Sequence, residues 1–463
     1  MADIALEGRP AYAAAEGRGV RIRVGVGWTR MVALLVLVTW LIPIKSYKLP
    51  VNLPFNLELY RLTIIVLLAA WLVAVSAGSA EARAGGRGKI VFVLAAGVTL
   101  SLLANLSTIN AAGLQTQAVK SLSFFLSYLL AFVLVSSVLD RMDQIVTVLR
   151  VTVIGAAIVA CEALYESRTH VNLFDQLHTV LPFLVHFGRD NVNVNGGALR
   201  VRASAQHPIA LGCALVMCVP LALHVATRAS SVRRKRAWLL LASVILMGAL
   251  ATVSRTVILM LVAMLICAFL LYGRKLLRYW PVLIVLFAAT HVAAPGVVSH
   301  IFKRFDPNGG LVSQLDSRAG MRGSGRLADL GPGLTAWSSS PLFGHGLGTV
   351  ASTGDQLSGP ASSQIPTVPI IFDDQYMNSL VSIGVLGVLC VLVFIWGSVA
   401  RMIRTARRTR GPDSQLLGAC AMSAAGFGAG MATFDAFTFV QATLMFFIIT
   451  ALGLRARTLL ESA

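Results

Sequence analysis

The chain has 463 residues, of which 56% are hydrophobic and 13% charged, and its formal net charge is +19. A soluble globular domain has about 25% charged residues, so this chain has too few to cover a surface that faces water. With a mean hydropathy of +0.77, the composition excludes a soluble enzyme, a disordered protein and a nucleic-acid-binding domain. The basic residues lie in short clusters between apolar runs, a pattern typical of membrane topology.

Twelve apolar runs are each long enough to cross a bilayer, which takes roughly 17–25 residues in a helix. They lie at 31–47, 57–77, 90–106, 121–139, 145–165, 208–226, 237–253, 256–272, 280–297, 377–399, 415–433 and 437–454. We therefore expect an all-α polytopic membrane protein with about 12 transmembrane helices. The count depends on a break at Ser254-Arg255, because one continuous helix over 237–272 would leave eleven spans.

The Lys and Arg clusters predict the orientation of these spans. They precede the first span and follow the second, fourth, sixth, eighth, tenth and last spans, so twelve spans put them all on one side. By the positive-inside rule this side is the cytoplasm. We expect a multi-pass protein of the cytoplasmic membrane with both termini in the cytoplasm. Residues 1–30 are predicted to be a disordered cytoplasmic tail, 31–454 the transmembrane domain and 455–463 a short cytoplasmic tail.

The two long loops, 166–207 and 298–376, face outward in this arrangement, and the second joins helices 9 and 10. Loops of this length are usually functional or disordered. Seven of the eight histidines lie in these loops or at outer helix ends. Nucleotide-activated donors are made in the cytosol, so a reaction centre on the outer face needs a substrate that is carried by a lipid. The chain also contains neither a P-loop nor a strand-linked dinucleotide motif.

The six cysteines all fall inside predicted spans, which favours small buried apolar side chains over a disulfide framework or a zinc site. We expect no metal and no cofactor.

The stretch Arg200 to Gly212 is a candidate anion site just before the sixth span. Pro208 suits the first turn of a helix, which places His207 near the N-cap at the outer surface. A helix N-terminus favours anions, and Arg200 and Arg202 add positive charge. The alternative is interfacial anchoring and an ordinary helix start.

Arg255 lies between two apolar runs, in Ser254-Arg255-Thr256. An arginine at a bilayer centre costs roughly 2.5–3.5 kcal/mol, so it tends to face a bundle interior or to snorkel. Arginine also binds phosphate in a bidentate manner. The residue is therefore either a diphosphate clamp or a snorkelling turn residue.

The loop before the tenth span carries further polar candidates. Glycine-rich stretches at 323–333 and 341–349 allow a ligand to approach the backbone, or form a mobile loop. Two adjacent carboxylates follow, in Phe372-Asp-Asp-Gln-Tyr376. Asp373 and Asp374 are positioned to act as a base or to accept hydrogen bonds from sugar hydroxyls, or else to cap a helix N-terminus.

Several motifs together resemble the bacterial O-antigen ligase/polymerase family. They are Ala205-Gln-His-Pro-Ile-Ala-Leu-Gly212, Ser254-Arg255, Pro341-Leu-Phe-Gly-His-Gly-Leu-Gly-Thr349, Asp373-Asp-Gln-Tyr376 and Gly384-Val-Leu-Gly387, and they occur in the family's order. The resemblance covers roughly residues 195–390. It implies a metal-independent integral-membrane glycosyltransferase that transfers a glycan from undecaprenyl diphosphate to an acceptor hydroxyl. It also implies the lipid-linked oligosaccharide and the bilayer as partners, other polysaccharide-assembly proteins as candidate partners, and no nucleic acid.

Residue by residue, Arg255 matches the arginine of the family's Ser-Arg motif, and Arg326 matches the loop arginine upstream of a tryptophan, here Trp337. Asp373-Asp374 stands where ligases have His-Asn. The ligases' proposed base is therefore absent, which favours a polymerase or another surface-polysaccharide enzyme over attachment to a lipopolysaccharide core. Gly331-Pro-Gly333 is expected to interrupt the helix after Arg326.

These matches lead to a mechanistic hypothesis. Arg255 and Arg326 would stabilise the leaving diphosphate, with Arg202 and Tyr376 as further substrate-binding residues. One of the two aspartates would orient or deprotonate the acceptor hydroxyl, with His207 or His345 as alternative bases. The competing interpretation is a twelve-span exporter or flippase of polysaccharides or lipid-linked sugars. A transporter usually binds its substrate near the midplane between structural repeats, and the two halves of this chain show no evident repeat.

Overall fold

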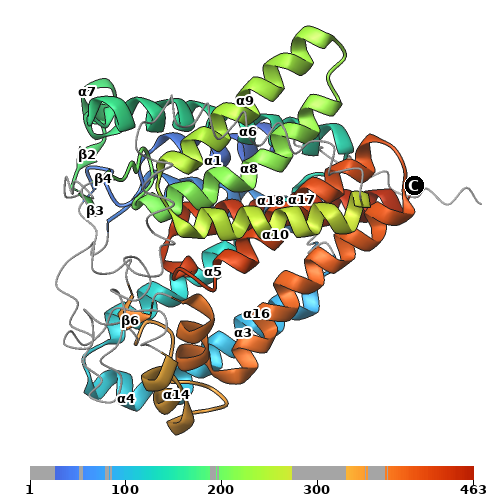
Figure 1. Ribbon diagram of the computed structural model, residues 1–463. Helices are drawn as coiled ribbons and strands as arrows, with labels where there is room; N and C mark the ends of the chain where they lie inside the picture. The colour runs from blue at the N-terminus through green and yellow to red at the C-terminus, as the bar shows by residue number, and fades with distance from the viewer. Residues whose placement is uncertain are drawn as a thin grey trace, which may run out of the picture.

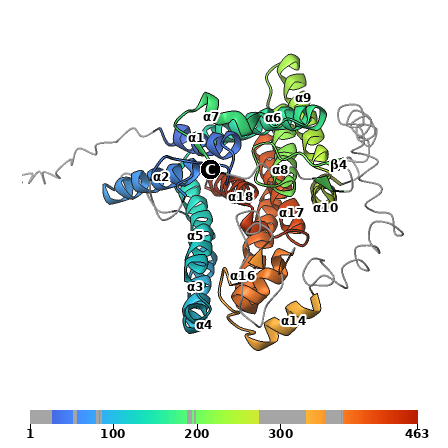
Figure 2. The ribbon, with the colours of Figure 1, turned by 90° about the vertical axis from the view of Figure 1, so that its left-hand side faces the viewer.

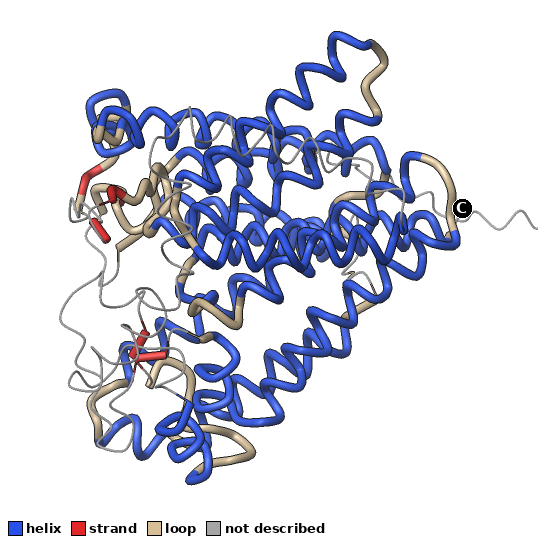
Figure 3. The backbone as a smooth tube through the Cα atoms, in the orientation of Figure 1, coloured by secondary structure: helices blue, strands red, loops and turns tan. Residues whose placement is uncertain are grey.

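The computed structural model describes residues 27–51, 56–78, 83, 86–187, 194–195, 198–273, 330–349, 351–352, 371–372 and 374–462. Within these ranges the protein is a bundle of long helices, most of which run along one axis (Figures 1 and 3). Strand is confined to pairs of two residues at one end of the bundle. Figure 2 views the molecule from this end, which we call the loop end.

The helices follow the chain in an order close to that of the predicted spans. The first half contains α1 (Trp28–Leu41), α2 (Leu59–Ser76), α3 (Gly88–Ala104), α4 (Leu106–Ala111), α5 (Gln115–Val138), α6 (Met142–Thr169), η1 (Leu173–Gln176) and α7 (Leu177–Val180). The second half contains α8 (Pro208–Thr227), α9 (Val232–Ala251), α10 (Arg255–Tyr272), α14 (Leu330–Ser339), α16 (Gln375–Arg408), α17 (Pro412–Gly430), η4 (Ala436–Thr438) and α18 (Val440–Glu461).

Seven of the described helices are long and apolar enough to cross a membrane, namely α2, α5, α6, α8, α10, α16 and α18. The apolar helices α1 and α3 are shorter, and α9 and α17 occupy two further predicted spans. The all-α polytopic class is thus confirmed. The predicted run 280–297 lies outside the described residues, and the total of twelve spans stays a prediction.

Helices α8 and α18 form the centre of the bundle, where nearly all their side chains are buried. The outer helices α2 and α10 instead expose large apolar side chains such as Val73 and Ile266. Because neither helix has a polar face to turn toward water, the exposed apolar surface suits a lipid environment.

The break between α9 and α10 lies where the sequence predicts it. The helix stops at Ala251, Val253 adopts a φ of +50°, and a new helix starts at Arg255. A β-branched residue is strained in this left-handed region, which interrupts the helical path. The two helices then diverge, since α9 packs on α6 and α8 whereas α10 packs on α8 and α17.

Two element boundaries differ from the prediction. The first span was expected to run to residue 47, but α1 ends at Leu41, and Ile42 is extended because it precedes Pro43. The expected interruption at Gly331-Pro-Gly333 is also wrong for the helix itself. These residues form the first turn of α14, where a proline needs no backbone N–H.

The strands tie loops together at the loop end. β1 (Tyr47–Lys48) pairs antiparallel with β2 (Val185–His186), and β3 (Val194–Asn195) with β4 (Ala198–Leu199). β5 (Ala351–Ser352) and β6 (Ile371–Phe372) are parallel. These pairs are too short to form a sheet core, and the fold rests on helix packing.

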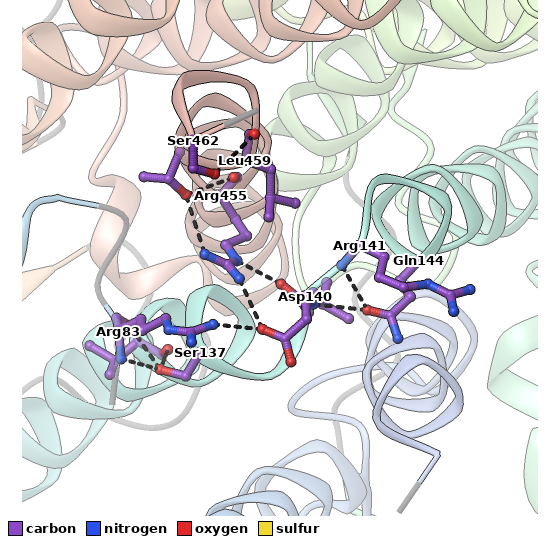
Figure 4. A network of polar contacts seen from close by, with 11 residues as sticks. Arg83, Ser137, Asp140, Arg141, Gln144, Arg455, Leu459 and Ser462 are labelled. Carbon is purple, nitrogen blue, oxygen red and sulfur yellow. Dashed lines mark hydrogen bonds and ion pairs between the residues drawn. The ribbon is translucent and has the colours of Figure 1, made fainter. Parts of the chain in front are cut away.

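Loops that were predicted to share the basic side of the membrane meet at the other end of the bundle. Asp140, which follows α5, pairs with Arg83 at 2.6 Å and with Arg455 of α18 at 2.9 Å (Figure 4). Arg228 after α8 likewise pairs with Asp413 after α16, at 2.5 Å. The alternation of the described helices therefore agrees with the predicted pairing of their loops.

Candidate functional site

The short connection between α17 and α18, residues 431–439, is the meeting point of the loop end. It bonds first to the start of α16. The backbone N–H of Gln375 donates to the Met431 carbonyl at 2.9 Å, and the side-chain oxygen of Gln375 accepts from the Phe437 N–H at 2.7 Å. Gln375 is buried, so these bonds fix the N-terminus of α16 against the connection.

The same connection also holds the helix starts of α8 and α10. The Gln206 amide donates to the Thr438 carbonyl at 2.9 Å, one residue before the N-cap of α8. At α10, the hydroxyls of Thr433 and Thr256 are 2.9 Å apart. Arg255, the first residue of α10 and half-buried, therefore lies directly beside this junction.

A second feature of the loop end is the glycine-rich loop 341–349, which docks into a kink in α16. Gly384 interrupts the helix with a φ of +68°. The loop takes over the backbone bonds that the kink frees. The N–H of His345 donates to Val381 and that of Gly346 to Ser382, while Val385 donates to Pro341, each at 2.9 Å. A broken helix in a membrane requires such replacement partners.

Glycine is required on both sides of this contact. Gly344 has a φ of +66°, and a Cβ there would lie 2.5 Å from the backbone carbon of Ser382. Gly384 would meet the Leu342 carbonyl in the same way. The glycines that the sequence singled out thus allow two backbones to approach, and they do not line an open ligand site.

Helix α3 completes the docking with two polar side chains. The Ser101 hydroxyl lies 2.5 Å from the Phe343 carbonyl oxygen and 3.0 Å from that of Ser382. The Asn105 amide donates to Gly344 at 2.9 Å. The loop is therefore held between α3 and α16 in a defined position.

A small polar cavity lies where the docked loop meets the 431–439 connection. Its polar walls come from five segments that are far apart in the sequence: Lys45, Lys120, Ser121, Gln375, Asn378 and Asp435. Aromatic rings from α5 and η4 form the other walls: Phe124, Phe125, Tyr128 and Phe437. The volume is about 60 Å³, room for a few water molecules. It suits individual hydroxyl or phosphate oxygens of a larger ligand.

Asp435 is the buried carboxylate of this cavity, with 1% of its surface exposed. It accepts hydrogen bonds from the Asn378 amide at 3.2 Å and from the Thr438 hydroxyl at 3.2 Å. The sequence interpretation missed Asp435, Lys45 and Lys120. A signal was present for Asp435, since an acidic residue in a turn of a few residues between two apolar spans is costly unless it has a function.

Residues 237–392 match the protein family described as O-Antigen ligase. The chain carries an O-antigen ligase family domain. The match runs from α9 through Arg255 and the docked loop to the middle of α16, and it confirms the predicted resemblance. It indicates a membrane protein that performs glycan transfer of the O-antigen ligase or polymerase type. No curated protein sequence matches the chain.

Within the O-antigen ligase domain, His345 and Tyr376 bond to neighbouring helices. The His345 Nε2 lies 2.9 Å from the Ala336 carbonyl of α14 and 3.1 Å from the Ser339 hydroxyl. The Tyr376 hydroxyl donates to Gly428 of α17 at 2.7 Å. These contacts position α14 and α16, and neither side chain lines the cavity.

Asp374 is the N-cap of α16 in the O-antigen ligase domain. Its carboxylate accepts the Tyr376 N–H at 2.8 Å, the capping role that the sequence offered as the alternative to a base. Asp373 and Arg326, the other two residues that the resemblance nominated within the domain, lie outside the described residues.

His207 and Arg202 precede the O-antigen ligase domain. His207 is the N-cap of α8, as predicted, and its Nδ1 accepts the Ile209 N–H at 3.2 Å. Burial, and secondly the charge of Arg200, lowers the pKa of His207 to about 3, so the ring is neutral. Its only lone pair is engaged in the cap, which leaves Nε2 as an N–H donor and makes the ring a poor base.

Arg202 is held in an ion pair on the loop before α8. One guanidinium nitrogen lies 2.7 Å from both carboxylate oxygens of Asp175, and the backbone N–H of Arg202 donates to Glu166 at the end of α6. The charge predicted to bind substrate is therefore partly neutralised by the protein itself.

Metal ligands are not gathered at this site. Across the described ranges, no group of three or more His, Cys, Asp or Glu side chains is arranged to hold a metal ion.

Proposed function

We propose that this protein is a membrane glycosyltransferase that moves a glycan from an undecaprenyl-diphosphate donor to an acceptor hydroxyl at the loop end. The family supplies the class of reaction. The donor, the site and the outer face of the cytoplasmic membrane are our inference. The observation that carries it is the buried Asp435, which shares a cavity with Lys45 and Lys120 beside the docked loop.

In this reaction the acceptor oxygen forms a bond to the anomeric carbon of the donor sugar as the bond to the diphosphate oxygen breaks. The acceptor proton passes to a base, and the polyprenyl diphosphate leaves with the bonding electrons. Negative charge grows on the leaving group, and preorganised cations stabilise it most in the transition state. Arg255 is our candidate for this role, with Arg326, and the two lysines add positive charge on the cavity side.

Asp435 is our candidate for the group that receives or orients the acceptor proton. It is buried in the cavity and held by Asn378, whereas Asp374 caps a helix and the rings of His207 and His345 are engaged in structural bonds. A carboxylate on a fixed hydrogen-bond donor is suited to accept a hydroxyl proton. The presence of Asp373-Asp374 in place of His-Asn favours a polymerase or another surface-polysaccharide enzyme over a core ligase.

The test is transfer by the purified protein in nanodiscs with a labelled polyprenyl-diphosphate oligosaccharide and no added metal. A ladder of products supports a polymerase, and one transfer to a second acceptor supports a ligase. We expect Asp435→Asn to lower the rate at least about 100-fold. The exposed Asp143→Asn at the opposite end is the matched control.

The proposal fails if the folded wild-type protein turns over no lipid-linked donor, or if Asp435→Asn and Asp143→Asn transfer glycan at the same rate. Donor that crosses the membrane without being consumed would indicate the transporter alternative. The orientation is tested separately, because a green fluorescent protein fused after residue 463 fluoresces only if the C-terminus is cytoplasmic.

A further inference from the structure

We propose that three arginines at the end of the bundle opposite the cavity, Arg87, Arg401 and Arg457, bind the phosphate group of an anionic phospholipid. We call them the arginine cluster. They come from the start of α3, the second half of α16 and the last turns of α18. This binding site does not depend on the proposed reaction.

Arg87 is the most buried member, with 7% of its surface exposed. One guanidinium nitrogen donates to the α16 carbonyls of Phe394, at 3.0 Å, and Val393. The absence of a side chain at Gly397 makes room, since a Cβ there would lie 2.6 Å from this nitrogen. Nε of Arg87 is buried without a hydrogen-bond partner. A buried donor of this kind is costly unless another group accepts from it.

Arg401 and Arg457 converge on the residue next to Arg87. Arg401 donates to the Gly86 carbonyl at 3.0 Å. A Cβ added to Gly86 would lie 3.3 Å from a guanidinium nitrogen of Arg401 and 3.7 Å from one of Arg457. Two cationic groups therefore reach the same point beside the N-cap of α3.

The charges in this cluster are not balanced by the described residues. Arg457 pairs with Glu461 at 2.6 Å, but no described carboxylate forms an ion pair with Arg87 or Arg401. Burial, and then the nearby charges of Arg401 and Arg457, lowers the pKa of Arg87 to about 10. The neighbouring Asp140 is already shared by Arg83 and Arg455 (Figure 4). An anion from outside this network would relieve the repulsion.

A phospholipid phosphate has the chemistry and the location that this cluster needs. Guanidinium groups bind phosphate oxygens through paired, charge-assisted hydrogen bonds. Basic pockets between transmembrane helices, near the ends of the spans, bind anionic headgroups. The cluster lies among the ends of α3, α16 and α18, where lipid phosphates are the most abundant anions.

Lipid binding here would brace the two helices that hold the docked loop at the other end. Helix α3 supplies Ser101 and Asn105 to the loop, and α16 contains the kink at Gly384. A headgroup that joins the ends of α3 and α16 opposes their separation. We therefore expect it to stabilise the whole fold.

The experiment measures the melting temperature of the purified protein in neutral detergent after addition of phosphatidylglycerol, phosphatidylcholine or inorganic phosphate. We expect phosphatidylglycerol to raise it by several degrees because the lipid binds the folded state alone. Arg401→Gln should lose most of this rise, and Arg401→Lys should lose part of it. Arg236→Gln, an exposed arginine of α9 at the same end, should keep it.

Three results would overturn the proposal. They are equal stabilisation by phosphatidylcholine, an unchanged rise in Arg401→Gln, or the same loss in Arg236→Gln. An equal effect of inorganic phosphate at the same concentration would assign the cluster to a free anion instead of a lipid. Glu81, which lies outside the described residues, is checked with Glu81→Gln. If Glu81 were the missing counter-charge, this variant would gain phosphatidylglycerol binding, and that result would also count against a lipid-occupied cluster in the natural protein.

Discussion

Gly384 of α16 and Leu342 of the docked loop touch through their backbones, so that a Cβ on Gly384 would overlap the Leu342 carbonyl oxygen. Gly384 also has a φ of +68°, a conformation that costs other residues about 1–2 kcal/mol. The bend of α16 and the position of the loop therefore depend on the same residue.

We expect Gly384→Ala to destabilise the protein strongly and to abolish glycan transfer, because the added methyl group forces the loop out of the kink. The measurements are the yield of folded protein, its melting temperature in detergent and its transfer rate. Gly97→Ala in α3 is the control, since a Cβ there meets nothing within 4 Å. Normal stability of Gly384→Ala would show that the contact between loop and helix is not needed.

The pair Arg202 and Asp175 gives a second prediction. The two side chains are 12% and 26% exposed and lie 2.7 Å apart. We expect Arg202→Gln and Asp175→Asn to lower the melting temperature by similar amounts, and the double variant to lose little more, because both remove the same ion pair. A transfer rate that falls much further in Arg202→Gln than in Asp175→Asn would instead support the predicted contact with substrate.

The helices and their order were predictable because burial in lipid requires long apolar runs, which are visible in any sequence. The break at 252–254 was predictable for the same reason, since Ser254-Arg255 is the only polar interruption of a long apolar stretch. The glycines of the 341–349 loop were recognised, but their role was not. A backbone contact with Gly384 leaves no trace in either segment alone.

The cavity was not predictable from the sequence, because it exists only after distant segments meet. Lys45 and Lys120 look like ordinary interfacial lysines at helix ends. Asp435 lies in a turn only a few residues long, and its hydrogen bond to Asn378 joins α16 to the connection before α18. Linear spacing carries no information on such a contact.

Arg255 carries a third prediction. Arg255→Ala should reduce glycan transfer about 100- to 1,000-fold, the usual loss when a preorganised group that stabilises the transition state is removed. The protein should still reach the membrane, since this side chain stands at the start of a helix. Arg234→Ala, exposed at the opposite end, is the control. Normal polymer from well-expressed Arg255→Ala would remove this arginine from the mechanism.

His207 predicts how stability depends on pH. The ring is buried and its pKa is about 3 in the folded protein, against about 6.5 in an unfolded chain. Between these values only the unfolded state binds the proton, so stability is full above pH 6.5 and falls as the pH is lowered. The contribution of one histidine is at most about 1.4 kcal/mol per pH unit.

The measurement is the melting temperature of the wild type and of His207→Asn from pH 8 to pH 5. Asparagine keeps an oxygen that can cap α8, but it does not titrate, so the comparison isolates the imidazole from the other ionisable groups. We expect the wild-type curve to fall more steeply below pH 6.5 than that of the variant. Parallel curves would mean that the ring is protonated as readily in the folded protein as in the unfolded chain, and the assignment of His207 as a neutral cap would be wrong.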